Sequence, residues 1–367
     1  MTCQNSLMVK TLLLMTDGVY KKVKKNSPID ENRCFIIAEI GVNHNGELSI
    51  AKQLIYEAKK AGADAVKFQT FKANLLSSPL TPKVKYQLNN SKKEETHYEM
   101  LKNLELSYED HFILKSYCDE LGIEFMSTPY DVESAIFLNE EIDVSVFKTA
   151  SADIVDIPLH NYIASTDKKS IVSVGMANLG EIETIYNIYK SFARNNLIFL
   201  HCVSNYPCSN KSLNLKVIKT LQQTFQVPVG YSDHSLGNIA SIISIAYGSK
   251  VIEKHLTIDK ELPGPDHFAS SNPTEFTELV AAIKTAEEML GSSVKECQNE
   301  EIEMAKVSRK SLHLKRDIKE GEILSKEDLC LMRPGTGLGY SQIVNLIGKK
   351  ALANLKKGLQ INFSDLG

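Results

Sequence analysis

Short apolar runs alternate with amphipathic stretches along most of the chain. The runs are rich in Ile, Val and Phe, and eight of them can be counted from residue 35 onward. They lie at residues 35–42, 63–71, 123–130, 144–151, 170–176, 197–204, 227–235 and 250–258. Several stretches between them show a helical period, and some end on a glycine that suits a left-handed helix end; they include 48–62, 107–122, 180–195 and 238–248. Eight strand-and-helix units predict an α/β fold, a (β/α)8 TIM barrel.

The pattern changes after a last amphipathic stretch at 273–291. Residues 292–306 are polar and are expected to form a linker to a smaller module over 307–367. That module contains an internal repeat, because DIKEGEILSKEDL at 317 and NLKKGLQINFSDL at 354 both place Gly fifth and end in Asp-Leu. The repeat predicts two similar arms around a pseudo-twofold axis. Residues 1–34 are expected to be an N-terminal extension, which leaves 35–291 for the barrel.

Composition narrows the class of protein. The chain of 367 residues is 43% hydrophobic and 24% charged, which is ordinary for a globular protein. Its formal net charge of -3 gives no case for binding nucleic acid or an anionic membrane. The seven scattered cysteines form no Cys-x-x-Cys pair, so they favour a reducing cytoplasm over a disulfide framework or thiolate zinc site. The apolar stretch LMVKTLLLM near the N-terminus is shorter than a membrane-spanning helix.

Nearly every predicted strand ends in polar or ionisable residues. On the last strand, Glu253 and His255 alternate and therefore point to the same face. The C-terminal ends of barrel strands form the active-site face, so residues far apart in sequence are expected to converge on one mouth. These residues are Glu39, Lys67, Thr128, Lys148, Ser151, Ser173, Ser204, Ser232, His234, Glu253 and His255.

Two histidines differ from the rest of the set. His234 and His255 lie at the ends of neighbouring predicted strands. Two imidazoles, with water and substrate oxygens in the other positions, suit a catalytic divalent ion, with Mn²⁺ expected first and Mg²⁺ or Co²⁺ as alternatives. A lone histidine is more often a hydrogen-bonded structural residue. That is the interpretation for His97, His111, His160 and His313.

Seven motifs resemble, in order, those of the bacterial sialic acid synthases, the phosphoenolpyruvate-dependent N-acetylneuraminate synthase family. They are AEIGVNHNG, AVKFQTF, STPY, FKTAS, GYSDHS, EKHLTIDKELPGPDHFAS and RPGTG. The match covers about residues 35–367, and the tail resembles that family's antifreeze-like (SAF) domain. The resemblance implies a transferase that condenses phosphoenolpyruvate with an N-acetylated amino sugar and releases phosphate. The sugar would be N-acetylmannosamine or a 2,4-diacetamido-6-deoxy hexose.

The resemblance also implies roles at the phosphoenolpyruvate site and the metal. The family's metal ligands fall on His234 and His255. Four residues correspond to those that hold the phosphate: Lys148, Ser151, Ser173 and Ser232. Lys67 and Thr128 correspond to residues directed to the carboxylate. Ser204 stands where some members have Asn.

For the amino sugar, the corresponding residues are Glu39, Tyr206, Asp266 and Arg333. Asp266 follows a Pro-Gly-Pro turn, which restricts the backbone that carries it. Arg333 lies in the tail, and in the family the matching Arg reaches the partner's barrel, so the resemblance implies a domain-swapped homodimer. Asp153 stands where the family commonly has a Glu proposed in proton handling; because Asp is one methylene shorter, this acid–base role is an open question.

Two alternative functions are kept. One is another carbon-bond-forming barrel, either a related sugar-acid synthase or a Schiff-base aldolase, which could use much of the same mouth. The other is a non-catalytic saccharide-binding protein, which would leave the histidine pair and the anion-binding residues without a task. The choice of sugar depends on loops such as 75–100, which the sequence pattern does not resolve.

Overall fold

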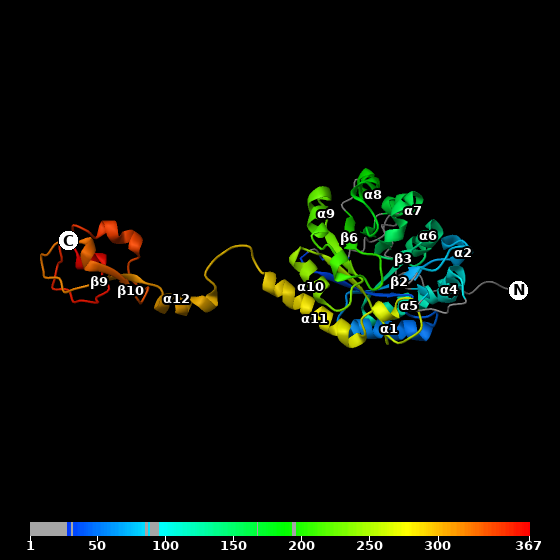
Figure 1. Cartoon of the computed structure of the whole chain (residues 1–367), viewed down its shortest axis with the longest axis horizontal. Coiled ribbons are helices and arrows are strands. Elements are labelled where there is room, and N and C mark those ends of the chain that lie inside the picture. Colours follow the sequence, from blue (N-terminus) through cyan, green and yellow to red (C-terminus); the bar gives the residue numbers. More distant parts are fainter. Residues whose placement is uncertain (1–27, 31, 85–86, 89–94, 167, 193–195) are drawn as a thin grey trace, which may run out of the picture. The chain divides into compact units, whose positions relative to one another are not determined.

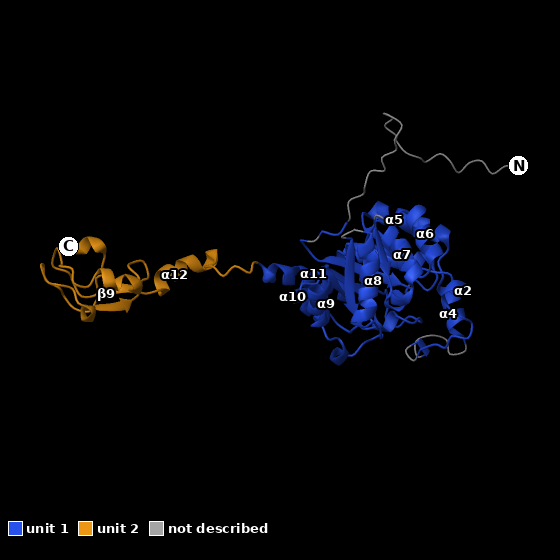
Figure 2. Cartoon of the chain, turned by 90° about the horizontal axis from the view of Figure 1, so that it is seen from above, with its two compact units in different colours: residues 1–291 blue, residues 292–367 orange. Residues whose placement is uncertain are grey.

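The computed structural model describes residues 28–30, 32–84, 87–88, 95–166, 168–192 and 196–367 (Figure 1). The chain divides into two compact units, residues 1–291 and 292–367 (Figure 2). Most of the predicted N-terminal extension, including its apolar stretch, lies outside the described residues. In the described part, no helix is long and apolar enough to cross a membrane.

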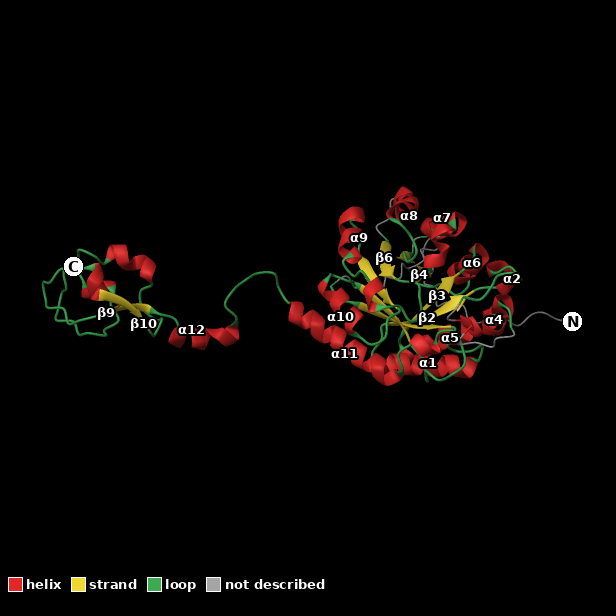
Figure 3. Cartoon of the chain, viewed as in Figure 1, coloured by secondary structure: helices red, strands yellow, loops and turns green. Residues whose placement is uncertain are grey.

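Eight parallel strands form the centre of the first unit, and helices surround them (Figure 3). The strands are β1 Phe35–Gly41, β2 Ala65–Thr70, β3 Glu124–Pro129, β4 Val146–Thr149, β5 Lys169–Ser173, β6 Leu197–Cys202, β7 Val229–Asp233 and β8 Val251–His255. Their hydrogen-bonded order is β3-β2-β1-β8-β7-β6-β5-β4, and the two outer strands, β3 and β4, lie next to each other. The barrel is therefore nearly closed, and the predicted TIM-barrel architecture is confirmed.

The outer layer consists of helices whose ends follow from local sequence. They are α1 Leu48–Ala61, α2 Ala73–Leu76, α4 His97–Leu104, α5 Tyr108–Leu121, α6 Val132–Glu140, α7 Ile157–Ser165, α8 Leu179–Ser191, α9 Val217–Phe225, α10 Ile239–Ala246 and α11 Pro273–Leu290. Helix α5 shows both end signals. Ser107 and Asp110 form a reciprocal capping box at its start, and Gly122 ends it with a positive φ of 65°.

Alternation along the strands separates an apolar barrel floor from a polar mouth. On β1, Phe35, Ile37 and Glu39 project to the same side because they are two residues apart. Phe35 and Ile37 belong to the apolar cluster that fills the barrel, whereas Glu39 comes last, near the C-terminal end of the strand. Strand β8 repeats the arrangement with Val251 in that cluster and Glu253 and His255 above it. The site is therefore built at one end of a packed core.

The second unit has the symmetry that its sequence repeat predicts. Ile318 and Leu355, which are equivalent in the two arms, donate to each other's carbonyl at 2.9 and 2.8 Å. Gly321 and Gly358, the fifth residues of the arms, have φ values of 80° and 81°. Other bonds recur with the same sequence offset, such as Leu314 N to Leu359 O and Ala351 N to Glu322 O. The arms are thus related by a pseudo-twofold axis.

The second unit also contains two short strands and a helix. Strands β9 Ser311–Leu314 and β10 Leu329–Met332 pair antiparallel. The stretch expected to be only a polar linker instead contains the start of a helix, α12 Ile302–Ser308. The sequence missed it because no side chain of α12 is buried, so there is little core-facing apolar pattern.

Candidate active site

Two lysines and two glutamates form a buried network at the centre of the barrel mouth. Lys67 Nζ lies 2.5 Å from Glu39 Oε2 and 3.7 Å from Glu253 Oε2, and it donates to Thr128 Oγ1 at 2.9 Å. Lys148 Nζ lies 3.5 Å from Glu253 Oε1. The strand register explains the contact between Glu39 and Lys67, since Glu39 of β1 is opposite Lys67 of β2 on one side and His255 of β8 on the other.

Burial and charge set the protonation of this network. Burial acts to raise the pKa of Glu253, but Lys148 and Lys67 outweigh it and hold that pKa below its usual range. Burial raises the pKa of Glu39 despite the opposing effect of Lys67. Burial acts to lower the pKa of Lys67, but its two glutamate neighbours outweigh burial and raise that pKa. In Lys148 burial is the larger effect, so the pKa of Lys148 is lowered. An anionic ligand would therefore compete with Glu253 for the lysines.

The two histidines predicted to bind metal face each other, with ring centres 5.6 Å apart. His234 donates through Nδ1 to the Val203 carbonyl at 2.8 Å, which leaves Nε2 as the nitrogen with the lone pair. Nε2 lies 3.2 Å from Ser232 Oγ, but the hydroxyl hydrogen of Ser232 is donated to Glu253 Oε1 at 2.8 Å. The lone pair of His234 therefore receives no proton from that neighbour.

His255 also has a ring nitrogen without a hydrogen-bond partner. Its Nδ1 is buried and makes no hydrogen bond; the nearest carboxylate oxygen, Asp266 Oδ2, lies 3.9 Å away. Burial lowers the pKa of both His234 and His255, and the neighbouring His234 and Lys67 lower that of His255 further. Both imidazoles are thus held neutral, the form that coordinates a metal.

These histidines fit a divalent ion with two protein ligands. Across the described residues, no group of three or more His, Cys, Asp or Glu is arranged to hold a metal. A bound ion would therefore take its other ligands from water and substrate. Two neutral nitrogen donors facing one space are consistent with such an open site.

Tyr206 and Asp266 border the histidine pair. The Tyr206 ring centre lies 4.2 Å from that of His234 and 5.4 Å from that of His255. Asp266 is buried, and burial together with nearby Glu39 raises its pKa to about 7. Two of the four residues predicted to contact the sugar, Tyr206 and Asp266, thus lie next to the predicted metal ligands.

Ser151 and Ser204 meet around a glycine that the sequence analysis did not single out. A Cβ added to Gly175 would lie 2.6 Å from Ser204 Oγ, 2.7 Å from Cys202 Sγ and 2.9 Å from Ser151 Oγ. The Gly175 N–H donates to Ser151 Oγ at 3.0 Å. Ser173, two residues earlier, is buried at the end of β5. Because Gly175 has no Cβ, these hydroxyls have room to approach its backbone. Glycine carries no polar side chain, so no signal in the sequence indicated that this position belongs to the site.

Asp153 follows β4 in a short 3₁₀ helix, η1 Ser151–Val155. Its Oδ2 is buried without a hydrogen-bond partner, and burial, with a contribution from Asp156, raises its pKa to about 7. Its carbonyl accepts a bond from His160 Nε2 at 3.1 Å. This carboxyl is available to hold a proton near neutral pH, which leaves its predicted role in proton handling open.

Other side chains at the mouth were missed by sequence reasoning. Gln69 Nε2 donates to Glu39 Oε1 at 3.2 Å. Asn43 donates through Nδ2 to the Leu256 carbonyl and to Ser270 Oγ, so it links the loop after β1 to the loop that carries Asp266. Both lie in motifs quoted for the family resemblance, but an amide in a motif carries no signal of what it contacts.

Arg333 belongs to the second unit, directly after β10. It donates through Nε to the Ser308 carbonyl at 2.9 Å and is exposed. Its contribution to a partner's site stays a prediction. The four histidines expected to be structural all have hydrogen bonds within their own surroundings, as for His111 with Thr70 Oγ1 at 2.7 Å.

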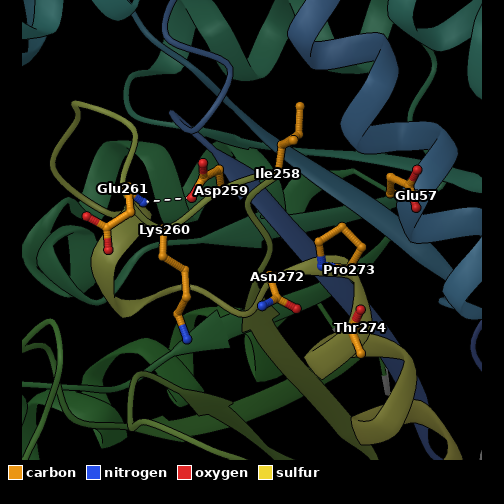
Figure 4. Close-up of a pocket in the computed structure, with 8 residues that line it drawn as sticks. All are labelled: Glu57, Ile258, Asp259, Lys260, Glu261, Asn272, Pro273 and Thr274. Carbon is orange, nitrogen blue, oxygen red and sulfur yellow. Dashed lines mark hydrogen bonds between the residues drawn. The ribbon is translucent and has the colours of Figure 1, made fainter.

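A surface cavity of about 510 Å³ is lined by none of the residues of this network. Figure 4 shows the residues that line it. Glu57 of α1, residues 258–261 after β8 and the first residues of α11 line it. Two of its polar side chains have local partners: Asn272 caps α11, and Lys260 pairs with Glu275 at 2.8 Å. None of the predicted site residues lines it, so it is not the candidate active site.

Comparison with known proteins shows the family of each unit. A model of the NeuB family matches residues 54–295, and a model of the SAF domain matches 309–367. The chain is 47% identical to N,N'-diacetyllegionaminic acid synthase of Legionella pneumophila, over 89% of this chain and 92% of that protein. It is 36% identical to human N-acetylneuraminate-9-phosphate synthase, over 89% and 91%.

A solved structure shows the same relationship. The N-acetylneuraminic acid synthetase of Leptospira borgpetersenii, crystallised with citrate, superposes with a TM-score of 0.68 at 36% identity. The match covers 75% of this chain and 90% of that one.

Proposed function

We propose, because the chain belongs to the NeuB family, that this nonulosonic acid synthase condenses phosphoenolpyruvate with a 2,4-diacetamido-6-deoxy hexose to form a legionaminic-type acid and phosphate. The observation that carries the proposal is the pair of buried imidazole nitrogens, His234 Nε2 and His255 Nδ1, that receive no hydrogen bond beside a network of buried lysines. A saccharide-binding site would have no use for them.

The lysines and hydroxyls account for phosphoenolpyruvate. Lys148 would hold the phosphate together with the hydroxyls of Ser151, Ser173 and Ser232, since a phosphate accepts charge-assisted and neutral hydrogen bonds at once. Lys67 and Thr128 would hold the carboxylate. Their mutual bond of 2.9 Å keeps the ammonium and the hydroxyl side by side.

The amino sugar would lie next to the histidines. Asp266 and Glu39 can accept hydrogen bonds from sugar hydroxyls, while the Tyr206 ring packs beside the imidazoles. Arg333 of a partner subunit would donate to an N-acetyl carbonyl. This arrangement makes the functional unit a domain-swapped homodimer.

The reaction forms one carbon–carbon bond. C3 of phosphoenolpyruvate attacks the aldehyde carbon of the open-chain sugar, water adds its oxygen to C2, and the C2–O bond to phosphate breaks to leave a ketone at C2. The two protons of the water end on the former aldehyde oxygen and on the released phosphate. His234 and His255 would hold a divalent ion, Mn²⁺ first, with Mg²⁺ or Co²⁺ as alternatives; when bound, it supplies Lewis-acid polarisation of the aldehyde oxygen. Lys67 and Lys148 act by orienting the anionic reactant.

The comparisons support the choice of sugar. Identity is 47% and 41% to N,N'-diacetyllegionaminic acid synthases of Legionella pneumophila and Campylobacter jejuni. It falls to 36% for both the human N-acetylneuraminate-9-phosphate synthase and a pseudaminic acid synthase of Campylobacter jejuni. N-acetylmannosamine is therefore the second candidate substrate.

A substrate panel tests the proposal. The purified protein would be incubated with phosphoenolpyruvate, Mn²⁺ and each candidate sugar, and phosphate release and product mass would be recorded. We expect the diacetamido sugar to give the highest kcat/KM and a product three carbons longer than the sugar. No phosphate release with any nonulosonic acid precursor would contradict the proposal, and His234→Ala serves as the inactive control.

A Schiff-base aldolase is the main rival, because burial lowers the pKa of Lys148 and imine-forming lysines need such a shift. Against it, Lys148 lies 3.5 Å from Glu253 and donates to the Thr149 carbonyl. Borohydride added during turnover separates the two. A covalent lysine adduct would favour the aldolase, and unmodified protein with continued phosphate release favours the synthase.

A further inference from the structure

A buried ion pair lies directly behind the two histidines. Lys254 Nζ is 2.9 Å from Asp233 Oδ2, and the side chains are 2% and 0% exposed. Neighbouring strand residues point to opposite faces, so Asp233 and Lys254 project outward while His255 and Glu253 project into the mouth. None of the roles derived above uses this pair.

The pair joins β7 to β8 in the register that the mouth requires. Asp233 is opposite Lys254, and Ser232 is opposite Glu253. The same alignment therefore makes one contact on each face: Ser232 Oγ donates to Glu253 at 2.8 Å inside, and Lys254 donates to Asp233 outside. A slip by one residue would turn every side chain of the strand to the wrong face.

The carboxylate of Asp233 also fixes the residue that follows His234. Its Oδ1 accepts from Ser235 N at 2.9 Å and Ser235 Oγ at 2.6 Å, and its Oδ2 accepts from Ser241 Oγ at 2.6 Å. Lys254 Nζ donates to the Ser235 carbonyl at 2.8 Å. The backbone is therefore held on both sides of His234.

Stability alone is a weak reason for this arrangement. Taking two charges out of water has a large desolvation cost, and well-packed apolar residues often replace a buried ion pair without loss of stability. What such residues would not reproduce is the directional set of bonds around Ser235. The pair is more specifically suited to orienting His234, whose Nδ1 is already committed to the Val203 carbonyl.

We propose that Asp233 and Lys254 are positioning residues that aim His234 Nε2 at the space it shares with His255 and so set the affinity for a divalent ion. The proposal rests on the proposed function only in assuming that these two histidines bind the ion. Groups that orient metal-binding histidines typically change metal affinity by about 10–100-fold.

The test is Mn²⁺ binding to metal-free full-length protein, measured by calorimetry without substrate. The main variant is Asp233→Asn with Lys254→Met, which avoids leaving one buried charge unpaired. We expect this double variant to bind Mn²⁺ at least about tenfold more weakly, while its affinity for phosphoenolpyruvate changes less than about threefold because no proposed phosphate ligand is altered.

A second ion pair, which is partly buried, supplies the control. Lys83 Nζ lies 3.1 Å from Glu95 Oε1, and neither residue is in the candidate site. Lys83→Met with Glu95→Gln should leave Mn²⁺ affinity at the parent value. If the Asp233 and Lys254 double variant does not fold, Ser235→Ala and Ser241→Ala each remove a bond to the carboxylate more mildly, and each should weaken Mn²⁺ binding by several-fold.

The outcomes separate the two proposals. Parent-like Mn²⁺ affinity in the folded double variant, or in both serine variants, would overturn the positioning role and leave the synthase proposal intact. Absence of Mn²⁺ binding by the parent protein would instead refute the metal site itself. Weakened Mn²⁺ binding with unchanged phosphoenolpyruvate affinity supports the positioning role.

Discussion

Replacing Asp153 by Asn removes a buried carboxyl at the mouth while keeping its size. Burial raises the pKa of Asp153 from 3.8 to about 7, with a smaller contribution from Asp156. The folded state therefore holds this proton more tightly than the unfolded state does. The resulting stabilisation is fully present below pH 3.8 and is lost as pH rises through about 7, so the carboxyl increasingly favours unfolding at alkaline pH.

The size of the effect follows from the pKa difference. At about 1.4 kcal/mol per pKa unit, ionisation of the carboxyl disfavours the fold by about 2 kcal/mol at pH 5 and about 4 kcal/mol at pH 8. The unrounded difference is about 2.6 kcal/mol, and we reduce it to about 2 kcal/mol because Asp153 is partly exposed and solvent screens it. At about 2 °C per kcal/mol for a domain of this size, it corresponds to roughly 4 °C.

The assay is thermal melting by circular dichroism at pH 5 and pH 8. We expect the melting temperature of Asp153→Asn, relative to the parent, to increase by roughly 4 °C between the two pH values. Asp153→Glu, which restores a carboxyl, should keep the pH dependence of the parent. A difference between Asn variant and parent that is the same at both pH values would refute the reasoning, as would a difference that shrinks at pH 8.

Three further predictions concern the site. Chelator should abolish turnover and Mn²⁺ should restore it, whereas His234→Ala and His255→Ala should stay inactive with Mn²⁺ although circular dichroism shows a folded barrel. Gly175→Ala should raise KM for phosphoenolpyruvate by about tenfold or more, because its Cβ would push against Ser151 and Ser204, and should alter KM for the sugar much less; equal effects on both would contradict it. Arg333→Ala should impair use of the sugar more than use of phosphoenolpyruvate. If sites are shared between subunits, reassembling Arg333→Ala chains with His234→Ala chains should recover activity. Confirmed heterodimers without activity would exclude sharing.

Much of the fold was predictable because its signals are local. Each of the eight apolar runs became a strand, since a run of β-branched and aromatic residues can be recognised without knowing its neighbours. The repeat at 317 and 354 likewise predicted the symmetry of the second unit, with Gly321 and Gly358 in matching conformations. Helix α12 was missed because it has no buried face to impose a pattern.

The residue types of the site were also visible in the sequence, but their pairing was not. Polar residues at strand ends, such as Lys67 and Glu253, can be recognised in the sequence because they interrupt an apolar run. That Lys67 contacts Glu39, Glu253 and Thr128 together depends on the order of strands around the barrel. The same holds for Gly175, whose role is only to leave space.

The sequence by itself determined the barrel, the symmetric tail and the ionisable residues available at the mouth, because hydrophobic period, turn residues and strand-end polarity are properties of short segments. Only the tertiary structure decided which nitrogen lone pairs at the mouth receive no hydrogen bond. Ser232 donates to Glu253 because the register of β7 and β8 places them opposite each other, and this leaves His234 Nε2 without a donor. The same pairing of β7 with β8 brings the ring of His234 to within 5.6 Å of the ring of His255, and this register between two strands is fixed by the whole fold rather than by either segment alone.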